Sequence, residues 1–262
     1  MNVYLSALWA EALKAYKSGI IWISFAAVAL LPLMDGFFMI ILKNPEQARQ
    51  MGLIGAKAQL AAGTADWPTF YYVLLMGGVM MGMILFAFLA AWVFGREFSD
   101  HTVKEWLALP TSRSTIVVSK LVLLTVWIQV LTLWIFGLGI VVGGAVNIPG
   151  GSPVLDTLSF WRMMSIGILL ALLMPWVAFI AGVGRGYLLP VAWAIVTMAA
   201  AQVSVVLGWG EWFPWAVPAL VAEIAGPKGG SIGAHSLIVL CITALVGIAA
   251  TFLWWRSADQ SK

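Results

Sequence analysis

The stretch FGREFSDHTVKEWLALPTSRSTIVVSK, residues 94–120, is the most charged segment of the chain, and it lies between two long apolar runs. The whole sequence of 262 residues is 62% hydrophobic and only 10% charged, whereas soluble domains average about 25% charged residues. This composition indicates an integral membrane protein. The charged stretch is then a polar connection between two membrane spans.

The apolar runs on both sides of this stretch are long enough to cross a bilayer, which requires about 20 mostly apolar residues. We therefore expect an all-α membrane protein with six transmembrane helices and a single domain over residues 1–262. The third run is long enough to tilt or to begin before the membrane. The six predicted spans are 18–42, 70–95, 115–146, 162–184, 187–208 and 234–255.

The first 19 residues, MNVYLSALWAEALKAYKSG, lack the basic start, short apolar core and small-residue cleavage site of a signal peptide. Apolar and aromatic side chains recur there at helical spacing, while Glu11, Lys14 and Lys17 lie on other faces. This pattern predicts an amphipathic helix in the membrane interface. The alternative is a cytosolic extension of the first span.

Lysine and arginine are distributed unequally between the two sides of the predicted spans, with nine on one side and five on the other. Because cytoplasmic connections carry the excess of these residues, both termini and the 94–116 connection should be cytoplasmic, in a multi-pass protein of the inner membrane. Such a small net charge, in short segments, does not indicate a nucleic-acid partner. The nine are Lys14, Lys17, Arg96, Lys104, Arg113, Lys120, Arg185, Arg256 and Lys262.

The outward connection at 209–227 carries Trp209, Trp212 and Trp215 among prolines. Aromatic side chains of this kind are typical of the membrane–water interface. Two interpretations stay open here: a short helix that enters the outer half of the bilayer, or an ordinary interfacial loop.

Ionisable residues are scarce inside the predicted spans, and Asp35 is the clearest case. It is either a polar point on a substrate path or an interfacial carboxylate at the end of a helix kinked by Pro32. The second interpretation is favoured, because one acid without an evident partner is weak evidence for a path. Arg185, in the segment AGVGRGYLLP, is expected to mark a tight inner turn.

Within the charged stretch, Thr102 and Glu105 fit a capping box that would begin a short helix, VKEWLAL. Pro110 would end this helix, and the following TSRS offers caps for the next one. The short helix displays Trp106 and Leu107. That apolar face either docks a cytosolic partner or lies on the bundle and the lipid headgroups.

Several chemistries are not supported by the residues. His101 and Glu97 are four residues apart and could share a helical face, but a zinc site usually needs three or four protein ligands. The sequence has no G-x-x-x-x-G-K-[ST] phosphate loop, so we expect no ATP hydrolysis, no bound cofactor and no enzymatic activity in this chain.

The charged stretch also resembles the cytoplasmic loop of ABC-2 type permeases, the membrane subunits of one class of ABC transporter. In that family an acidic residue after the second span is followed by a Gly-Thr pair, an apolar stretch, proline, a Ser-Arg pair and lysine. His101 stands where the family usually has glycine. This difference bears on the local backbone conformation and not on the identity of the loop. The segment around Glu11 and the layout of six spans are similar too. The matching residues are Glu97, Thr102, Leu107, Pro110, Ser112, Arg113 and Lys120.

The resemblance implies the permease subunit of an ATP-driven transporter that exports a hydrophobic or amphipathic substrate. Family members combine two permease chains, identical or related, with two ATPase subunits that bind ATP and magnesium. A short cytoplasmic coupling helix would seat in the ATPase through Trp106, while Glu97 would orient the loop, by hydrogen bonds or by an ion pair with Arg113. The alternatives are a membrane scaffold that recruits a cytosolic protein and a secondary transporter. The residues implied in coupling are Glu97, Thr102, Trp106, Leu107, Pro110 and Arg113.

Overall fold

A computed structural model describes residues 3–44, 52, 63–100, 112–223 and 232–257. Within these residues the secondary structure is helical, and six helices are long and apolar enough to cross a membrane. The fold class predicted from the sequence, an all-α protein with six candidate spans, is confirmed. The helices are α1 (Val3–Lys17), α2 (Ile20–Lys43), α5 (Trp67–Ser99), α7 (Arg113–Val146), α8 (Pro153–Gly184), α9 (Leu188–Val206), α10 (Val217–Val221) and α11 (Ala234–Ser257), with 3-10 turns η1 (Gly210–Trp212) and η2 (Pro214–Ala216).

Helix α8 begins at Pro153, so it extends outward beyond residue 162, where the predicted span begins. Ser152 caps the helix by accepting a hydrogen bond from the Leu155 amide at 3.2 Å. The polar residues that made 153–161 look like a loop are partnered: Asp156 accepts a hydrogen bond from the Tyr71 hydroxyl at 2.8 Å. A paired carboxylate does not interrupt a helix, so α8 continues outward.

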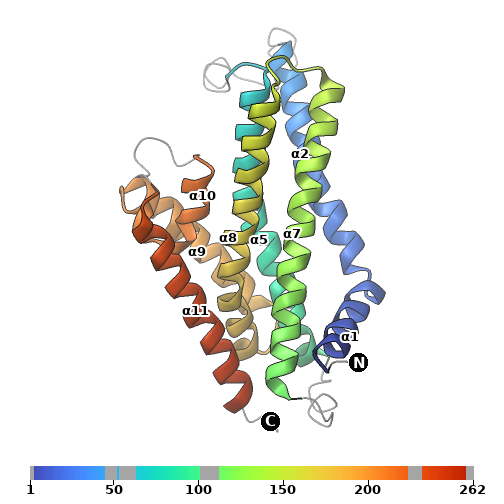
Figure 1. The fold of residues 1–262 in the computed structure, drawn as a ribbon, viewed down its shortest axis with the longest axis vertical. Coiled ribbons are helices and arrows are strands. Elements are labelled where there is room, and N and C mark those ends of the chain that lie inside the picture. Colours follow the sequence, from blue (N-terminus) through green and yellow to red (C-terminus); the bar gives the residue numbers. More distant parts are fainter. Residues whose placement is uncertain (1–2, 45–51, 53–62, 101–111, 224–231, 258–262) are drawn as a thin grey trace.

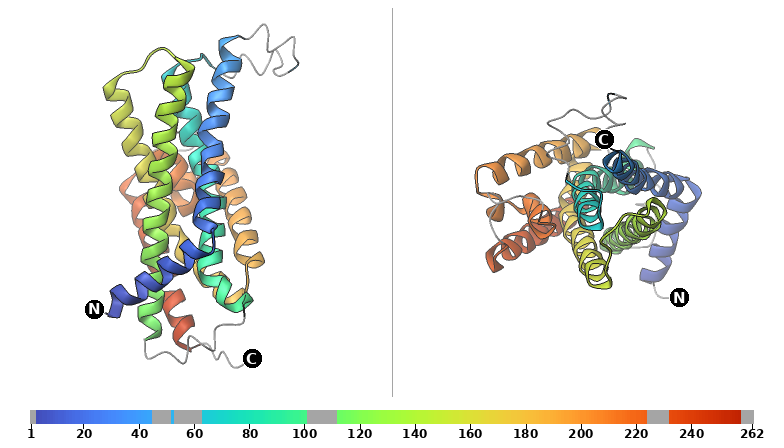
Figure 2. Two further views of the ribbon diagram at one scale, coloured as in Figure 1. Left: turned by 90° about the vertical axis from the view of Figure 1, so that its right-hand side faces the viewer. Right: turned by 90° about the horizontal axis from the view of Figure 1, so that it is seen from above.

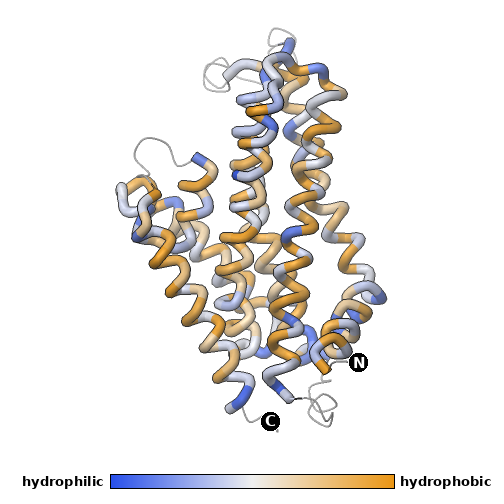
Figure 3. Tube along the Cα trace, viewed as in Figure 1, coloured by the Kyte–Doolittle hydropathy of each residue, from blue (hydrophilic) through white to orange (hydrophobic). Residues whose placement is uncertain are grey.

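Helix α8 forms the centre of the bundle, with α5, α7, α9 and α11 packed around it (Figures 1 and 2). In its most apolar 18-residue window 67% of the residues are buried, against 22% in α9. The difference separates a core helix from one that presents most of its surface to the surroundings. Hydrophobic residues cover most of the helical surface, and hydrophilic residues gather toward the ends (Figure 3).

The helices differ in length, and this gives the molecule a step at one end. Helices α5, α7 and α8 contain 33, 34 and 32 residues, well beyond the roughly 20 that a span needs. Together with α2 they extend past α10 and the neighbouring ends of α9 and α11 (Figure 1). At the far end Lys43 donates hydrogen bonds to the carbonyls of Val146 and Asn147, which ties α2 to the C-terminus of α7.

The segment between α9 and α11 folds into η1, η2 and α10, and α10 packs against α8. The prediction of a short helix within 209–227 is thus confirmed for Val217–Val221. Its depth in the bilayer stays a prediction. At the opposite end Arg185 adopts a left-handed conformation with a φ of 47° at the end of α8, which confirms the expected tight turn.

Glycines bring helices into close contact where a side chain would not fit. A Cβ atom added to Gly143 of α7 would lie 2.5 Å from the indole ring of Trp67. That ring is itself held by Phe70 and Tyr71, with ring centroids 5.6 and 5.2 Å away. The neighbouring Gly144 has no heavy atom within 4 Å of the same position. Only the first glycine is required by packing.

We therefore predict opposite effects for two adjacent substitutions. Gly143→Ala should destabilise the protein by about 1–3 kcal/mol, because the methyl group overpacks a rigid aromatic cluster. Gly144→Ala should leave stability unchanged or raise it, because alanine favours a helix over glycine by about 1 kcal/mol. Thermal unfolding of the two detergent-solubilised variants measures both. Equal melting temperatures would contradict the assigned contact.

Candidate functional site

The two ends of the 94–116 connection lie at the end of the bundle that carries α1 and the end of α11 (Figure 1). Helix α5 ends at Ser99, and α7 begins after Ser112, whose hydroxyl accepts a hydrogen bond from the Thr115 amide at 3.2 Å. This confirms the predicted cap for the second of these helices. The predicted coupling residues Thr102, Trp106, Leu107 and Pro110 lie outside the described residues, so the capping box and the short helix stay predictions.

Helix α1 crosses this end of the bundle (Figure 2). Glu11 and Ala15 are its buried residues. Its large apolar side chains point away from the protein, with Trp9 68% exposed and Tyr16 60% exposed. An outward apolar stripe is the arrangement that an interfacial helix needs, because lipid can cover it.

The inward face of α1 meets α5 and α7 in a cluster of four charged side chains, which we call the charge cluster: Glu11, Lys14, Glu97 and Lys120. The Lys120 ammonium lies 3.1 Å from Glu11 Oε2 and 3.0 Å from Glu97 Oε1. It also donates a hydrogen bond of 2.7 Å to the Val93 carbonyl of α5. Lys14 lies 2.8 Å from Glu11 Oε1 and 3.2 Å from Glu97 Oε1.

Pairing explains how these charges can be buried. The side chain of Lys120 is only 2% exposed, and those of Glu11 and Glu97 are 6% exposed. An isolated buried charge is costly, whereas a buried charge with opposite charges and hydrogen-bond partners is tolerated. Two lysines face two glutamates, so the cluster has no net formal charge. Its four side chains connect α1, α5 and α7, which are far apart in the sequence.

The charge cluster shifts the pKa values of its two residues from α1, Glu11 and Lys14. Burial by itself would raise the pKa of Glu11, but the nearby Lys120 and Lys14 outweigh it and hold that pKa below its ordinary value. Burial, together with repulsion from Lys120, lowers the pKa of Lys14. A lowered carboxyl pKa means that the cluster favours the ionised Glu11. The ionised Glu11 therefore stabilises the packing of α1 on the bundle. This stabilisation is fully present at pH values above the ordinary carboxyl pKa, and it is lost as the pH falls through the lowered pKa of Glu11.

Arg113 makes different contacts from the ion pair that was suggested. The suggested ion pair between Glu97 and Arg113 is wrong, because Glu97 is paired with the two lysines. Arg113 Nη1 instead donates hydrogen bonds of 3.3 Å to the carbonyls of Trp255 and Arg256. These carbonyls end α11, where a positive charge is favourable. The start of α7 is thereby attached to the end of α11.

Aromatic contacts hold the end of α5 to the same part of α11. The ring centroid of Phe98 lies 5.7 Å from that of Trp254 and 5.8 Å from that of Trp255, and Phe94 lies 6.3 Å from Trp255. Gly95 also lies against the turn between α8 and α9, where an added Cβ would be 2.9 Å from the Gly186 carbonyl oxygen. Both ends of the 94–116 connection are thus fixed to α1, α11 or the α8–α9 turn.

Asp35 lies away from this cluster, in the body of α2. The helix continues through Pro32 and Asp35 to Lys43, so the expectation of a carboxylate at a helix end is wrong. The residue is 6% exposed, and within the described residues its Oδ2 makes no hydrogen bond. Helix α2, which carries it, packs against α7 and α5.

The sequence analysis counted Lys120 among the positive charges that set the topology and treated Glu11 only as a match to a family pattern. It did not predict the buried ion pair between them. A signal for more was present, since Lys120 falls inside the predicted span 115–146. A lysine within a span is expected to have a partner. The partners were not deducible, because Glu11 is 109 residues away in the sequence.

Residues 7–201 match the model of the ABC-2 family transporter protein. The chain belongs to the ABC-2 transporter family. It is also 31% identical over 193 residues to a bacitracin transport permease protein of Bacillus licheniformis, an alignment that covers 72% of this chain and 88% of that protein. The ABC-2 chain described here is therefore a multi-pass transport permease. Membership of the family implies association with an ATPase.

The charge cluster predicts the effect of removing its central lysine. Lys120→Met should destabilise the ABC-2 chain by about 3–5 kcal/mol, because it leaves buried carboxylates with too little positive charge. Adding Glu11→Gln to that variant should recover part of the loss, since it removes one of the unpaired charges. Thermal unfolding in detergent measures both changes.

Lys17→Met is the matched control, because Lys17 is an exposed lysine of α1. It should unfold like the unchanged protein. If Lys120→Met behaved like Lys17→Met, the charge cluster would not be holding α1 to the bundle.

Proposed function

We propose that this permease is the membrane subunit of an ATP-driven exporter, assembled from two permease chains and two separate ATPase subunits. ATP and magnesium bind the ATPase, and this chain itself has no enzymatic activity and holds no cofactor. The substrate is a hydrophobic or amphipathic molecule. The printed name of the Bacillus licheniformis relative makes bacitracin the first compound to test. Family membership and the number of apolar helices support this proposal.

The observation that carries the mechanism is the attachment of both ends of the 94–116 connection to neighbouring helices. In the proposed mechanism the ATPase binds this connection through Trp106 and moves it when ATP closes the ATPase pair. Glu97 then passes the motion to α1 and α7 through Lys14 and Lys120, whose ammonium groups both lie within 3.2 Å of its Oε1 atom. Arg113 passes motion to α11 through its bonds to the helix end.

In the proposed orientation the end of the bundle with α1 and the charge cluster faces the cytoplasm. The excess of lysine and arginine on that side supports it. The outward apolar stripe of α1 then lies in the inner leaflet, next to the loop that the ATPase binds. Asp35 falls in the opposite half of α2, and we retain it as a possible polar point on the substrate path because it is buried without a partner for Oδ2 among the described residues.

Glu97→Gln separates coupling from assembly. The change keeps the shape of the side chain and removes its charge, so the ATPase should still co-purify. The change weakens the contacts of this residue with Lys14 and Lys120, and a hydrogen bond to a charged group contributes about 1.5–3 kcal/mol. A loss of that free energy at the coupling step corresponds to roughly a tenfold or greater loss of coupled transport. The measurements are ATP hydrolysis by the purified complex and bacitracin resistance of cells that express it.

Glu223→Gln is the control for this experiment, because Glu223 is an exposed carboxylate outside the 94–116 connection, and it pairs with Arg162 of α8. It should retain hydrolysis and resistance. Trp106→Ala, in contrast, should weaken co-purification of the ATPase, because aromatic anchors often contribute about 2 kcal/mol or more to an interface. A complex that assembles and transports normally with Glu97→Gln would remove Glu97 from the coupling route.

The orientation is tested by labelling engineered cysteines on intact cells with an impermeant maleimide. In a Cys241→Ser background, Thr64→Cys should react, because Thr64 precedes α5 at the end of the bundle opposite α1. Ser257→Cys at the end of α11 should react only after the cells are permeabilised. The reverse pattern would invert the proposed topology, while the helix bundle itself would be unaffected.

A further inference from the structure

Residues 210–223, which we call the connecting segment, lie between α9 and α11 in the chain and are attached to the bundle by charged side chains near both of their ends. At the far end Glu223 lies 2.5 Å from Arg162 of α8. At the near end Glu211 of η1 lies 3.4 Å from Nε2 of His235, in the first turn of α11. The two attachments differ in chemistry, because arginine stays charged whereas histidine gains or loses its charge near neutral pH.

The imidazole ring of His235 is held mainly by packing. The ring of Trp212 in η1 lies against it, with centroids 4.7 Å apart and planes tilted by 33°. On another side Gly233 is so close that an added Cβ atom would overlap the imidazole. The Glu211 carboxylate is near, but Nε2 makes no hydrogen bond to it or to any other described residue. The contact between η1 and α11 therefore has a charged partner in position that is not hydrogen-bonded.

A second proton on His235 changes this contact. Both ring nitrogens of the charged imidazolium are donors, so Nε2 then offers a proton to the Glu211 carboxylate. A cation against the face of an indole is also attracted by the ring of Trp212. The N-terminus of α11 opposes the change, because the helix dipole disfavours positive charge there. The two favourable contacts both come from η1, so protonation strengthens the attachment of η1 to α11.

The other elements that pack against α11 offer His235 no competing partner among the described residues. In the outer part of α8, Arg162 is paired with Glu223, and Asp156 accepts a hydrogen bond from Tyr71. The sequences of η2 and α10 contain no ionisable residue, and those of α7 lie in its first turns, at the opposite end of the bundle. The arginine of α11 itself is in its last turn. Glu211 is thus the carboxylate that His235 meets.

We propose that His235 and Glu211 form a pH-dependent latch, which fastens the connecting segment to α11 when the solution on that side of the membrane becomes acidic. Histidine changes its charge between about pH 8 and pH 5. As the pH falls through this range, the attachment of η1 strengthens, while the pair between Glu223 and Arg162 keeps its charges. As the pH rises, η1 is held by packing alone. In the orientation proposed above, the pH that acts is that outside the cell.

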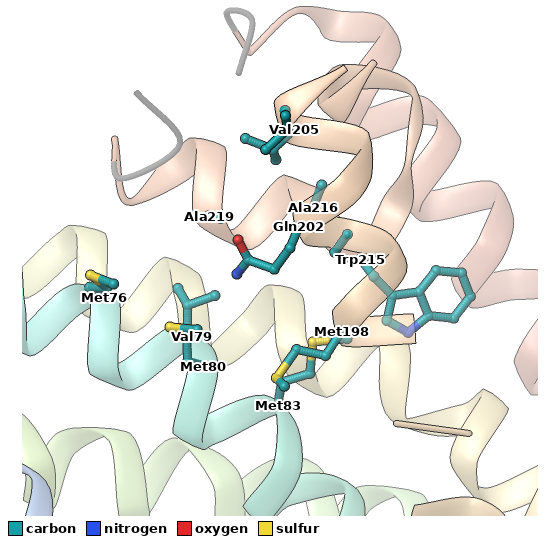
Figure 4. A pocket seen from close by; sticks show the side chains of 12 residues that line it. Met76, Val79, Met80, Met83, Met198, Gln202, Val205, Trp215, Ala216 and Ala219 are labelled. Atoms are coloured by element: carbon teal, nitrogen blue, oxygen red, sulfur yellow. The ribbon is translucent and has the colours of Figure 1, made fainter. Parts of the chain in front are cut away.

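The latch acts on a part of the chain that forms one wall of a cavity. Trp215 and Ala219, from η2 and α10 of the connecting segment, line a cavity of about 230 Å³ together with Met80 of α5 (Figure 4). Only Phe213 separates η1 from η2 in the chain, so a displacement of η1 shifts this wall. Through the latch, the external pH controls how firmly that side of the cavity is held in place.

The test is hydrogen–deuterium exchange of residues 208–216 in the full-length permease in lipid nanodiscs. It is measured at about pH 5.5 and about pH 8, within and above the range in which histidine becomes charged, and each rate is divided by the intrinsic chemical rate at the same pH. In the unchanged protein the protection should be greater at the lower pH by roughly threefold or more, as one partly exposed ion pair can provide. His235→Gln and Glu211→Gln should each remove this difference, because each removes one partner of the pair.

His101→Gln is the matched control, because His101 is the second of the two histidines in the chain and belongs to the 94–116 connection. This variant should keep the full pH difference at residues 208–216. Equal protection at the two pH values in the unchanged protein would overturn the latch. So would a pH difference that persists in His235→Gln. The measurement needs no ATPase and no substrate, so its failure is distinct from a failure of the proposed transport function.

Discussion

A lysine ammonium buried to 2% exposure must have opposite charges around it, and this requirement at Lys120 determines how one end of the permease is built. One carboxylate, Glu97, comes from the C-terminal end of α5, and the other, Glu11, comes from α1 at the beginning of the chain. The position of α1 therefore depends on a residue of α7. Without Lys120, Glu11 would keep only Lys14 of its own helix as an ion-pair partner among the described residues.

The polar attachment of α1 follows from where an interfacial helix lies. Its apolar stripe, with Trp9 and Tyr16, is available to lipid. The opposite face remains for contact with the bundle, and there the ion pairs of Glu11 and Lys14 act beside the fully buried, apolar Ala15. The same argument explains why Lys14 is partly exposed while Lys120 is not: the first lies on the edge of α1, and the second comes from inside α7.

Much of the fold was predictable from the sequence, because six apolar runs of sufficient length produce six spanning helices whatever their mutual packing. The start of α8 was not, since Asp156 and Arg162 suggest a loop until their partners are known. Those partners, Tyr71 and Glu223, are 85 and 61 residues away. The partner of Glu97 was predicted wrongly for a related reason. Arg113 is close to it in the sequence, but the two lysines that bind it come from α1 and from the next turns of α7.

The ion pairs of the charge cluster are shared in a way that allows the helices to move relative to one another. The single oxygen Glu97 Oε1 lies within 3.2 Å of both Lys14 and Lys120, and Glu11 offers a separate oxygen to each of the same lysines. A small rotation of the end of α5 can therefore lengthen one contact of Glu97 while the other remains, and neither lysine loses its pair with Glu11. An apolar contact of equal strength would open a void under the same rotation, with loss of its packing energy. A shared ion-pair network lets α5 move relative to α1 and α7 without leaving a buried charge alone, which is the mechanical property that the proposed coupling of the 94–116 connection to three helices requires.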